Sequence, residues 1–215
     1  MLITKIWKKI LDFFFNDCIN CGLEATEHKG LCEKCKEDIE LFHGCFNCKQ
    51  IFCCCEFKSF IPFVYKNCIR NLILRFKYSK QIYLGDIFAK MILDNINIKI
   101  DHRAVLIPVP ISRSKMFSRT YNQSVILCKS ISLLTGAPIA YFTFKKTKNT
   151  SQKGQSYDNR IANAINIELD DISKVINKNV FIIDDVIASG STVKRCSSLL
   201  QNICLSVNVI AIAKS

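Results

Sequence analysis

The stretch FIIDDVIASGST, residues 181–192, combines residue types that suit a phosphorylated sugar. Two adjacent acids, Asp184 and Asp185, follow an apolar run and precede a turn of small residues. Such a turn lets backbone N–H groups converge on an anion, and the helix that it opens adds its positive N-terminal end. The two carboxylates suit sugar hydroxyls or a hydrated magnesium ion. The alternative is an ordinary strand-to-helix turn with solvated acids. The turn consists of Ala188, Ser189, Gly190, Ser191 and Thr192.

Cysteine is the second unusual feature. The chain has 13 Cys, an odd number that fits a disulfide framework poorly, and most of them fall between Cys18 and Cys55. Two Cys-x-x-Cys pairs separated by ten residues predict a tetrahedral zinc site in a reducing compartment. The alternative is a set of reduced thiols without metal. The predicted ligands are Cys18, Cys21, Cys32 and Cys35.

A further group of cysteines could form a second zinc site. Cys45 and Cys48 form another Cys-x-x-Cys pair, and the run 53–55 is three Cys in a row, from which Cys53 and Cys55 are the candidate ligands. The sequence leaves open whether this set binds metal, remains as thiols, or interleaves with the first set.

Composition limits the class of protein. The 215 residues are 49% hydrophobic and 22% charged, with 7 Gly and 4 Pro, which excludes wholesale disorder and collagen-like or low-complexity chains. No apolar stretch is long enough to predict a membrane-spanning helix. The net charge of +12 favours a partner rich in phosphates, such as nucleic acid.

Three regions follow from the pattern along the chain. Residues 1–15 form a predicted amphipathic helix with a Lys-rich face, which either docks on its own protein or contacts a partner or membrane surface. Its lysines and the lack of a cleavage site argue against a signal peptide. Residues 16–58 form a Cys-rich module that needs a metal staple, and residues 60–215 form the main domain.

The main domain alternates helical and strand-like patterns, which predicts an α/β fold with a mostly parallel sheet. Residues 111–119 are expected to be a turn and 145–157 a basic loop. The predicted helices are 67–78, 81–96, 124–136 and 191–203, and the predicted strands are 63–65, 104–110, 138–144, 178–186 and 206–213.

The segment 181–192 resembles the phosphoribosyl pyrophosphate (PRPP) signature of type I phosphoribosyltransferases. A Cys-rich module followed by RFKY (75–78), IPVP (107–110), RTYNQS (119–124) and TSQKGQSYDNRIAN (150–163) is similar to the order found in the ComF/GntX family. The resemblance implies a zinc-ribbon-like module joined to a type I phosphoribosyltransferase-like domain with helices on both faces of its sheet.

The resemblance also implies roles for residues. Asp184 and Asp185 would hold the ribose hydroxyls of PRPP, and 188–192 its 5′-phosphate, with magnesium bound to the ligand. The implied pyrophosphate-facing and flexible-loop residues are Arg113, Arg119, Lys146, Lys148 and Arg160.

The function expected from the resemblance is that of a cytoplasmic competence protein. Such a protein would bind PRPP and zinc and handle single-stranded DNA during natural transformation, with competence machinery as partner, near the inner face of the membrane. Two alternatives remain: an active phosphoribosyltransferase acting on a small acceptor, and an interaction protein that senses PRPP. No general base stands out in the sequence.

Overall fold

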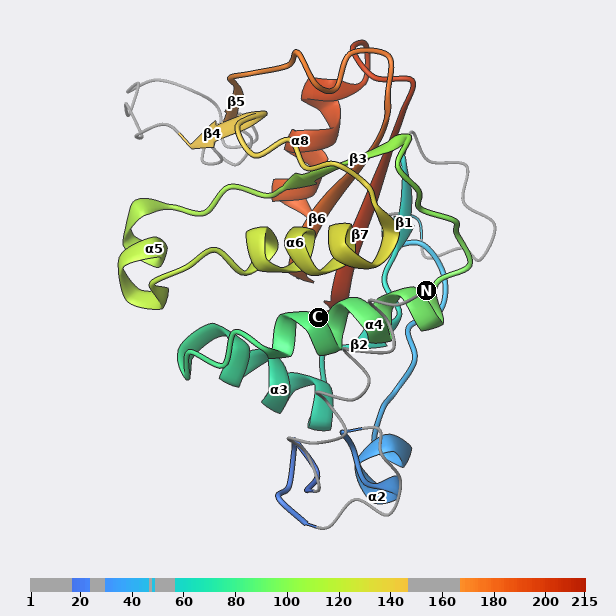
Figure 1. Cartoon of the computed structure of the whole chain (residues 1–215), viewed down its shortest axis with the longest axis vertical. Helices are drawn as coiled ribbons and strands as arrows, with labels where there is room; N and C mark the ends of the chain where they lie inside the picture. The colour runs from blue at the N-terminus through green and yellow to red at the C-terminus, as the bar shows by residue number, and fades with distance from the viewer. Residues whose placement is uncertain (1–16, 24–29, 47, 49–56, 147–166) are drawn as a thin grey trace.

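The computed structural model describes residues 17–23, 30–46, 48, 57–146 and 167–215 (Figure 1). Its centre is a five-stranded sheet with the order β1-β7-β6-β3, in which β2 also pairs with β7. All of these pairs are parallel. The strands are β1 Lys58–Phe60, β2 Phe63–Val64, β3 Ala104–Pro108, β6 Asn179–Ile187 and β7 Ser206–Lys214.

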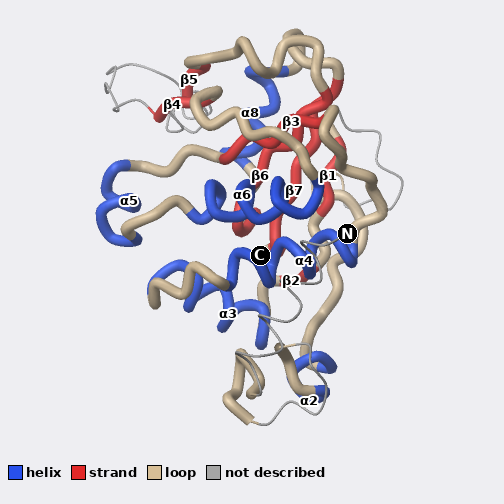
Figure 2. Tube along the Cα trace, in the orientation of Figure 1, coloured by secondary structure: helices blue, strands red, loops and turns tan. Residues whose placement is uncertain are grey.

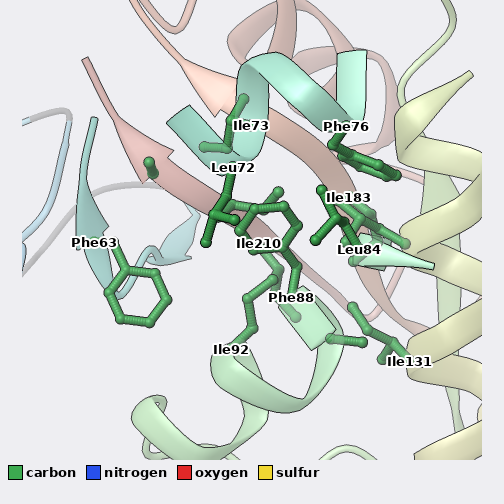
Figure 3. Packing of buried hydrophobic residues seen from close by; sticks show 14 of the residues in the cluster. Phe63, Leu72, Ile73, Phe76, Leu84, Phe88, Ile92, Ile131, Ile183 and Ile210 are labelled. Carbon is green, nitrogen blue, oxygen red and sulfur yellow. The ribbon is translucent and has the colours of Figure 1, made fainter. Parts of the chain in front are cut away.

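Helices cover both faces of this sheet, because alternate residues of each central strand point to opposite sides. On one side, Ile183 and Ile210 share a core with Leu72, Phe88 and Ile131 (Figure 3). These three come from α3 Asn67–Tyr78, α4 Leu84–Asn95 and α6 Gln123–Thr135. The predicted α/β class, with a mostly parallel sheet and helices on both faces, is confirmed.

The second core lies on the opposite face, under α8 Ser191–Leu200. Ile182 and Val209 pack there with Val193, Cys196 and Leu200. Because β6 contributes apolar side chains to both cores, the strand is fixed from two sides. The acids that follow Ile183 are therefore carried by one of the most constrained segments of the described chain.

Four smaller elements lie around the sheet (Figure 2). The helix α2 Glu33–Glu37 belongs to the Cys-rich region, and α5 Arg113–Arg119 projects beyond the end of β3. The strands β4 Phe144–Lys146 and β5 Ile167–Leu169 form a separate antiparallel pair.

Most predicted elements of the main domain are present, with three differences. Residues 113–119 form a helix instead of a turn, because Ser112 caps its N-terminus and Thr120 ends it in the left-handed conformation. Residues 138–144 form a single bridge between Ile139 and Leu106 instead of a strand, and pairing resumes at Phe144. The short strands β1 and β5 were not anticipated, since three residues carry too little periodicity.

The Cys-rich region packs directly on the main domain. Cys18, Ile19, Leu31 and Cys35 belong to the same core as Leu72 of α3. The predicted boundary between 16–58 and 60–215 stays a prediction, and β1, which begins at Lys58, lies across it. The predicted helix 1–15 lies outside the described residues.

Within the described part of the chain, no helix combines the length and apolar character needed to cross a membrane.

Candidate functional site

A cavity of about 280 Å³ opens where β3 and β6 end and α8 begins. The carboxyl ends of parallel strands are the usual position of ligand sites in open α/β sheets. The structure brings all seven residues of the predicted phosphate and sugar site to this one cavity. They are Asp184, Asp185, Ala188, Ser189, Gly190, Ser191 and Thr192.

The turn lines the cavity just beyond the end of the sheet. The ladder between β6 and β7 ends at Ile187, so the next N–H groups are outside the sheet pairing. Gly190 adopts the left-handed conformation with φ 75° and is the N-cap of α8. The hydroxyls of Ser189 and Ser191 lie 2.7 Å apart. The positive end of α8 and this cluster of donors suit a phosphate group.

The position of Gly190 also depends on the Cys-rich region. A Cβ atom at Gly190 would lie 2.3 Å from Cε2 of Phe46, which follows Cys45 directly. Both the backbone conformation and this close approach therefore require glycine.

Asp185 is enclosed by two cations. Its carboxylate lies 3.0 Å from Lys77 Nζ and 3.7 Å from Arg119, and these side chains are 10%, 13% and 12% exposed, respectively. Two ion pairs therefore compensate the charge of this enclosed carboxylate.

Asp184 has the opposite environment. Its Oδ1 accepts hydrogen bonds from Ser124 Oγ at 3.3 Å and from the Asp185 backbone N–H at 2.9 Å. Desolvation, followed by the neighbouring Asp185 charge, raises the pKa of Asp184 to about 7. The Asp184 carboxyl therefore exchanges its proton near neutral pH.

Four basic side chains line the cavity: Lys77, Lys115, Arg119 and Lys146. Arg119 lies over the Tyr78 ring, with its guanidinium carbon 5.4 Å from the ring centre, and donates to Gln123 Oε1 at 3.1 Å. Burial, with Lys115 nearby, lowers the pKa of Lys146. Four cations against two acids leave the cavity suited to a polyanion.

One further predicted basic residue is among those that the structure describes, and it lies away from the cavity. Arg113 is exposed on α5 and is not among the lining residues. Lys148 and Arg160 lie outside the described residues.

The four predicted zinc ligands are gathered in one cluster. The sulfur atoms of Cys18, Cys21, Cys32 and Cys35 all lie within 4.8 Å of one another. The Cys21 and Cys32 sulfurs are 3.7 Å apart. Tetrahedral Zn–S bonds of about 2.3 Å place sulfurs about 3.8 Å apart, so the arrangement fits zinc.

The surroundings of the cluster favour a thiolate at Cys18, whereas burial raises the pKa of the Cys35 thiol to about 12. Burial acts to raise the pKa of Cys18, but backbone N–H groups of Cys21, Cys32 and Asn20 lower it to about 6. Asn20 Nδ2 donates to Cys35 Sγ at 3.2 Å. Polar hydrogens directed at sulfur are typical of the outer shell of metal-binding cysteines.

The second set of cysteines is described in part. Cys45 is buried and Cys48 is partly buried, while Cys53 and Cys55 lie outside the described residues. The second metal site therefore stays a prediction.

Comparison with known proteins adds a relative that covers nearly the whole chain. Competence protein F of Haemophilus influenzae is 28% identical over 220 aligned positions, which cover 90% of this chain and 94% of that protein. This chain is therefore similar to that protein over nearly its whole length. No protein-family model matches it.

Solved structures give more distant likenesses. Hypoxanthine phosphoribosyltransferase of Trypanosoma cruzi aligns with a TM-score of 0.38 and 12% identity, over 65% of this chain and 67% of that one. The Staphylococcus aureus enzyme of the same name gives 0.35 and 21%, over 68% of this chain and 63% of that one. Because these TM-scores are below 0.5, we assign the fold class from the sheet and helices of this chain alone.

Three residues at the site were missed from sequence. Lys77 pairs with Asp185, Ser124 donates to Asp184, and Phe46 packs against Gly190. Lys77 lies in the RFKY motif and Ser124 in RTYNQS, so the motifs marked both residues without revealing their partners. Phe46 carried no signal beyond its place between Cys45 and Cys48.

A methyl group at Gly190 should lower the stability of the protein more than a methyl group at Gly136. We expect Gly190→Ala to lower the free energy of unfolding by about 1–3 kcal/mol beyond backbone strain, because the methyl meets Phe46. Gly136→Ala is the control, since φ there is +78° but no atom lies within 4 Å of the position that the methyl would occupy. Urea unfolding measures both. Equal losses would contradict the packing argument, whereas partial recovery in Phe46→Leu/Gly190→Ala would support it.

The proton on Asp184 should make stability depend on pH. The unfolded carboxyl ionises near pH 4, whereas the folded one has a pKa of about 7. Between these values the folded state binds more protons, so this residue's contribution to stability is lost as pH rises from about 4 through 7.

Replacing Asp184 by Asn should remove this contribution. We expect Asp184→Asn to flatten the fall of unfolding free energy between about pH 4 and 7. Asp94→Asn, which removes an exposed carboxyl on α4, is the matched control. Urea unfolding at a series of pH values makes the comparison, and parallel curves for wild type and Asp184→Asn would contradict the assignment.

Proposed function

We propose that the cavity binds PRPP. The observation that carries this proposal is the convergence of Asp184, Asp185 and the turn 188–192 on one cavity that four cations also line. The turn and the N-terminus of α8 receive the 5′-phosphate. The two acids receive the ribose hydroxyls, and the diphosphate, with magnesium, lies toward Lys115, Arg119 and Lys146.

We also propose that the Cys18, Cys21, Cys32 and Cys35 cluster holds a structural zinc ion. The short distances between its four sulfur atoms support this proposal. When bound, zinc would replace the core that this short region lacks, since structural zinc sites contribute folding free energy directly.

The biological role that we propose is that of a cytoplasmic competence protein that handles single-stranded DNA during natural transformation, together with competence machinery. Its likeness to Competence protein F supports this role. The charge of +12 supports a nucleic-acid partner.

The helix α5 offers a surface for this partner. Phe117 is 92% exposed there, and Arg113 lies one helical turn before it on the same helix. An exposed aromatic ring beside cations is the composition with which proteins bind single strands, because bases stack on the ring and phosphates meet the charges.

A second candidate is an active phosphoribosyltransferase. The observation that favours it is a carboxyl with a pKa of about 7 inside the cavity, since a group that titrates near neutral pH can accept a proton from an acceptor. Release of pyrophosphate from PRPP with a panel of bases and amines distinguishes this enzyme from a protein that only binds the ligand.

Ligand binding at the turn can be tested with a single hydroxyl. We expect Thr192→Val, which keeps the shape of the side chain, to weaken PRPP about tenfold in calorimetric titration with magnesium. Ser198→Ala removes an exposed hydroxyl later in α8 and should leave the affinity unchanged. No binding by the wild-type chain, or equal binding by Thr192→Val, would refute the proposed site.

The DNA surface predicts a separate pattern. We expect Phe117→Ala to weaken the binding of an oligothymidylate strand about tenfold, as measured by fluorescence anisotropy. We expect Arg113→Glu to reduce the dependence of this binding on salt concentration. Both variants should bind PRPP as the wild type does. Phe142→Ala, which removes another exposed ring (71%), is the control. Absence of DNA binding at low salt would reject the nucleic-acid role.

A further inference from the structure

The metal cluster and the cavity are connected through one arginine. Arg75 Nη1 donates to the backbone carbonyl of Ile19 and lies 3.5 Å from that of Asn20. Its Nε donates to Gln81 Oε1 at 2.9 Å. Ile19 and Asn20 are the two residues between Cys18 and Cys21, so Arg75 grips the backbone of the first Cys-x-x-Cys loop.

The same end of α3 contacts the cavity. Two residues after Arg75, Lys77 pairs with Asp185 at 3.0 Å. The next residue, Tyr78, lies under the guanidinium of Arg119, which also faces Asp185. Consecutive residues of one helical turn therefore contact the metal loop and the acid pair.

The helix between these contacts is firmly packed. Ile69, Leu72, Ile73 and Phe76 of α3 are fully buried in the first core. Figure 1 shows α3 lying between the region of α2 and the sheet. A displacement at Arg75 is therefore carried to Lys77 without being absorbed by loose side chains.

The Cys-rich region touches the cavity at a second point. Phe46, between Cys45 and Cys48, packs on the turn at Gly190 and on Phe57, with ring centres 5.9 Å apart. The acid pair and the phosphate turn, which would hold different parts of one ligand, are thus each supported from the Cys-rich region.

We propose that metal occupancy of the Cys18, Cys21, Cys32 and Cys35 cluster is coupled to ligand affinity in the cavity, with Arg75 as the positioning residue. This inference rests on the proposed binding of PRPP. With metal bound, the loop that carries Ile19 is fixed, and Arg75 fixes the end of α3 against Asp185. When metal leaves, this carbonyl is no longer held in place, so Lys77 and Arg119 lose their arrangement.

Coupling of this kind is reciprocal. If metal strengthens PRPP binding by a given factor, PRPP strengthens metal binding by the same factor. This consequence separates coupling from a general loss of folding, because it is measured on the intact wild-type chain.

The experiment compares zinc-loaded wild type, chelator-stripped wild type and loaded Arg75→Met, with zinc content measured by elemental analysis. PRPP with magnesium is titrated into each by calorimetry. We expect removal of zinc and the substitution Arg75→Met each to lower the affinity for PRPP about tenfold, within the usual range of coupling between sites. Arg75→Lys, which keeps one donor group, should recover part of the affinity. Arg70→Met, which removes an exposed charge from the same helix, should bind as the wild type does.

A second measurement covers the case in which the stripped chain unfolds. Zinc transfer from the wild type to a chromogenic chelator is followed with and without PRPP, and we expect PRPP to reduce transfer by the same factor, but not in Arg75→Met. Equal PRPP affinity in wild type and loaded Arg75→Met, or transfer that PRPP does not alter, overturns the coupling alone. Failure of the loaded wild type to bind PRPP overturns the proposed function and the coupling together.

Discussion

The arrangement of the cavity depends on the different electrostatic surroundings of two adjacent carboxylates, Asp184 and Asp185. Lys77 and Arg119 form ion pairs with Asp185, whereas desolvation and the Asp185 charge raise the pKa of Asp184 to about 7. Without Lys77 and Arg119, two enclosed negative charges would repel each other at the end of β6. The protein therefore needs α3 and the end of α5 to bring cations to this edge of the sheet.

This requirement explains why distant motifs of the sequence occur together. RFKY supplies Lys77 to Asp185 and Tyr78 to Arg119. RTYNQS supplies Arg119, and its Asn122 caps α6 through the Ser124 N–H while donating to the Val109 carbonyl at the end of β3. Each motif thus builds a different wall of one cavity, and none could be understood from its own residues.

The sequence predicted the elements with strong periodicity and the residues with distinctive chemistry. Helix α3 was predicted with the bounds that the structure shows, Asn67–Tyr78, because its apolar residues recur at helical spacing. The acid pair and the four cysteines were predicted from type and spacing, and the structure brings each set together. By contrast, α5 has no buried residue, so its helix left no hydrophobic pattern to read.

The contacts that could not be predicted are those across long sequence separations. Nothing in the sequence indicates that Arg75 donates to a carbonyl in the loop between Cys18 and Cys21. Nor does the sequence indicate that Phe46, which lies between two cysteines, packs so closely on Gly190 that a Cβ atom there would clash with its ring. Such pairings depend on the packed fold, since neither partner's residue type specifies the other.

If the chain binds PRPP as proposed, one cavity holds the phosphorylated pentose and its diphosphate at the same time. Phosphorus-31 NMR of PRPP with magnesium, titrated with the protein, tests this most directly. We expect the 5′-phosphate signal and both diphosphate signals to change together and to saturate at about one equivalent of protein, as for one site. Diphosphate signals that change while the 5′-phosphate signal stays constant, or unchanged signals throughout, would contradict it.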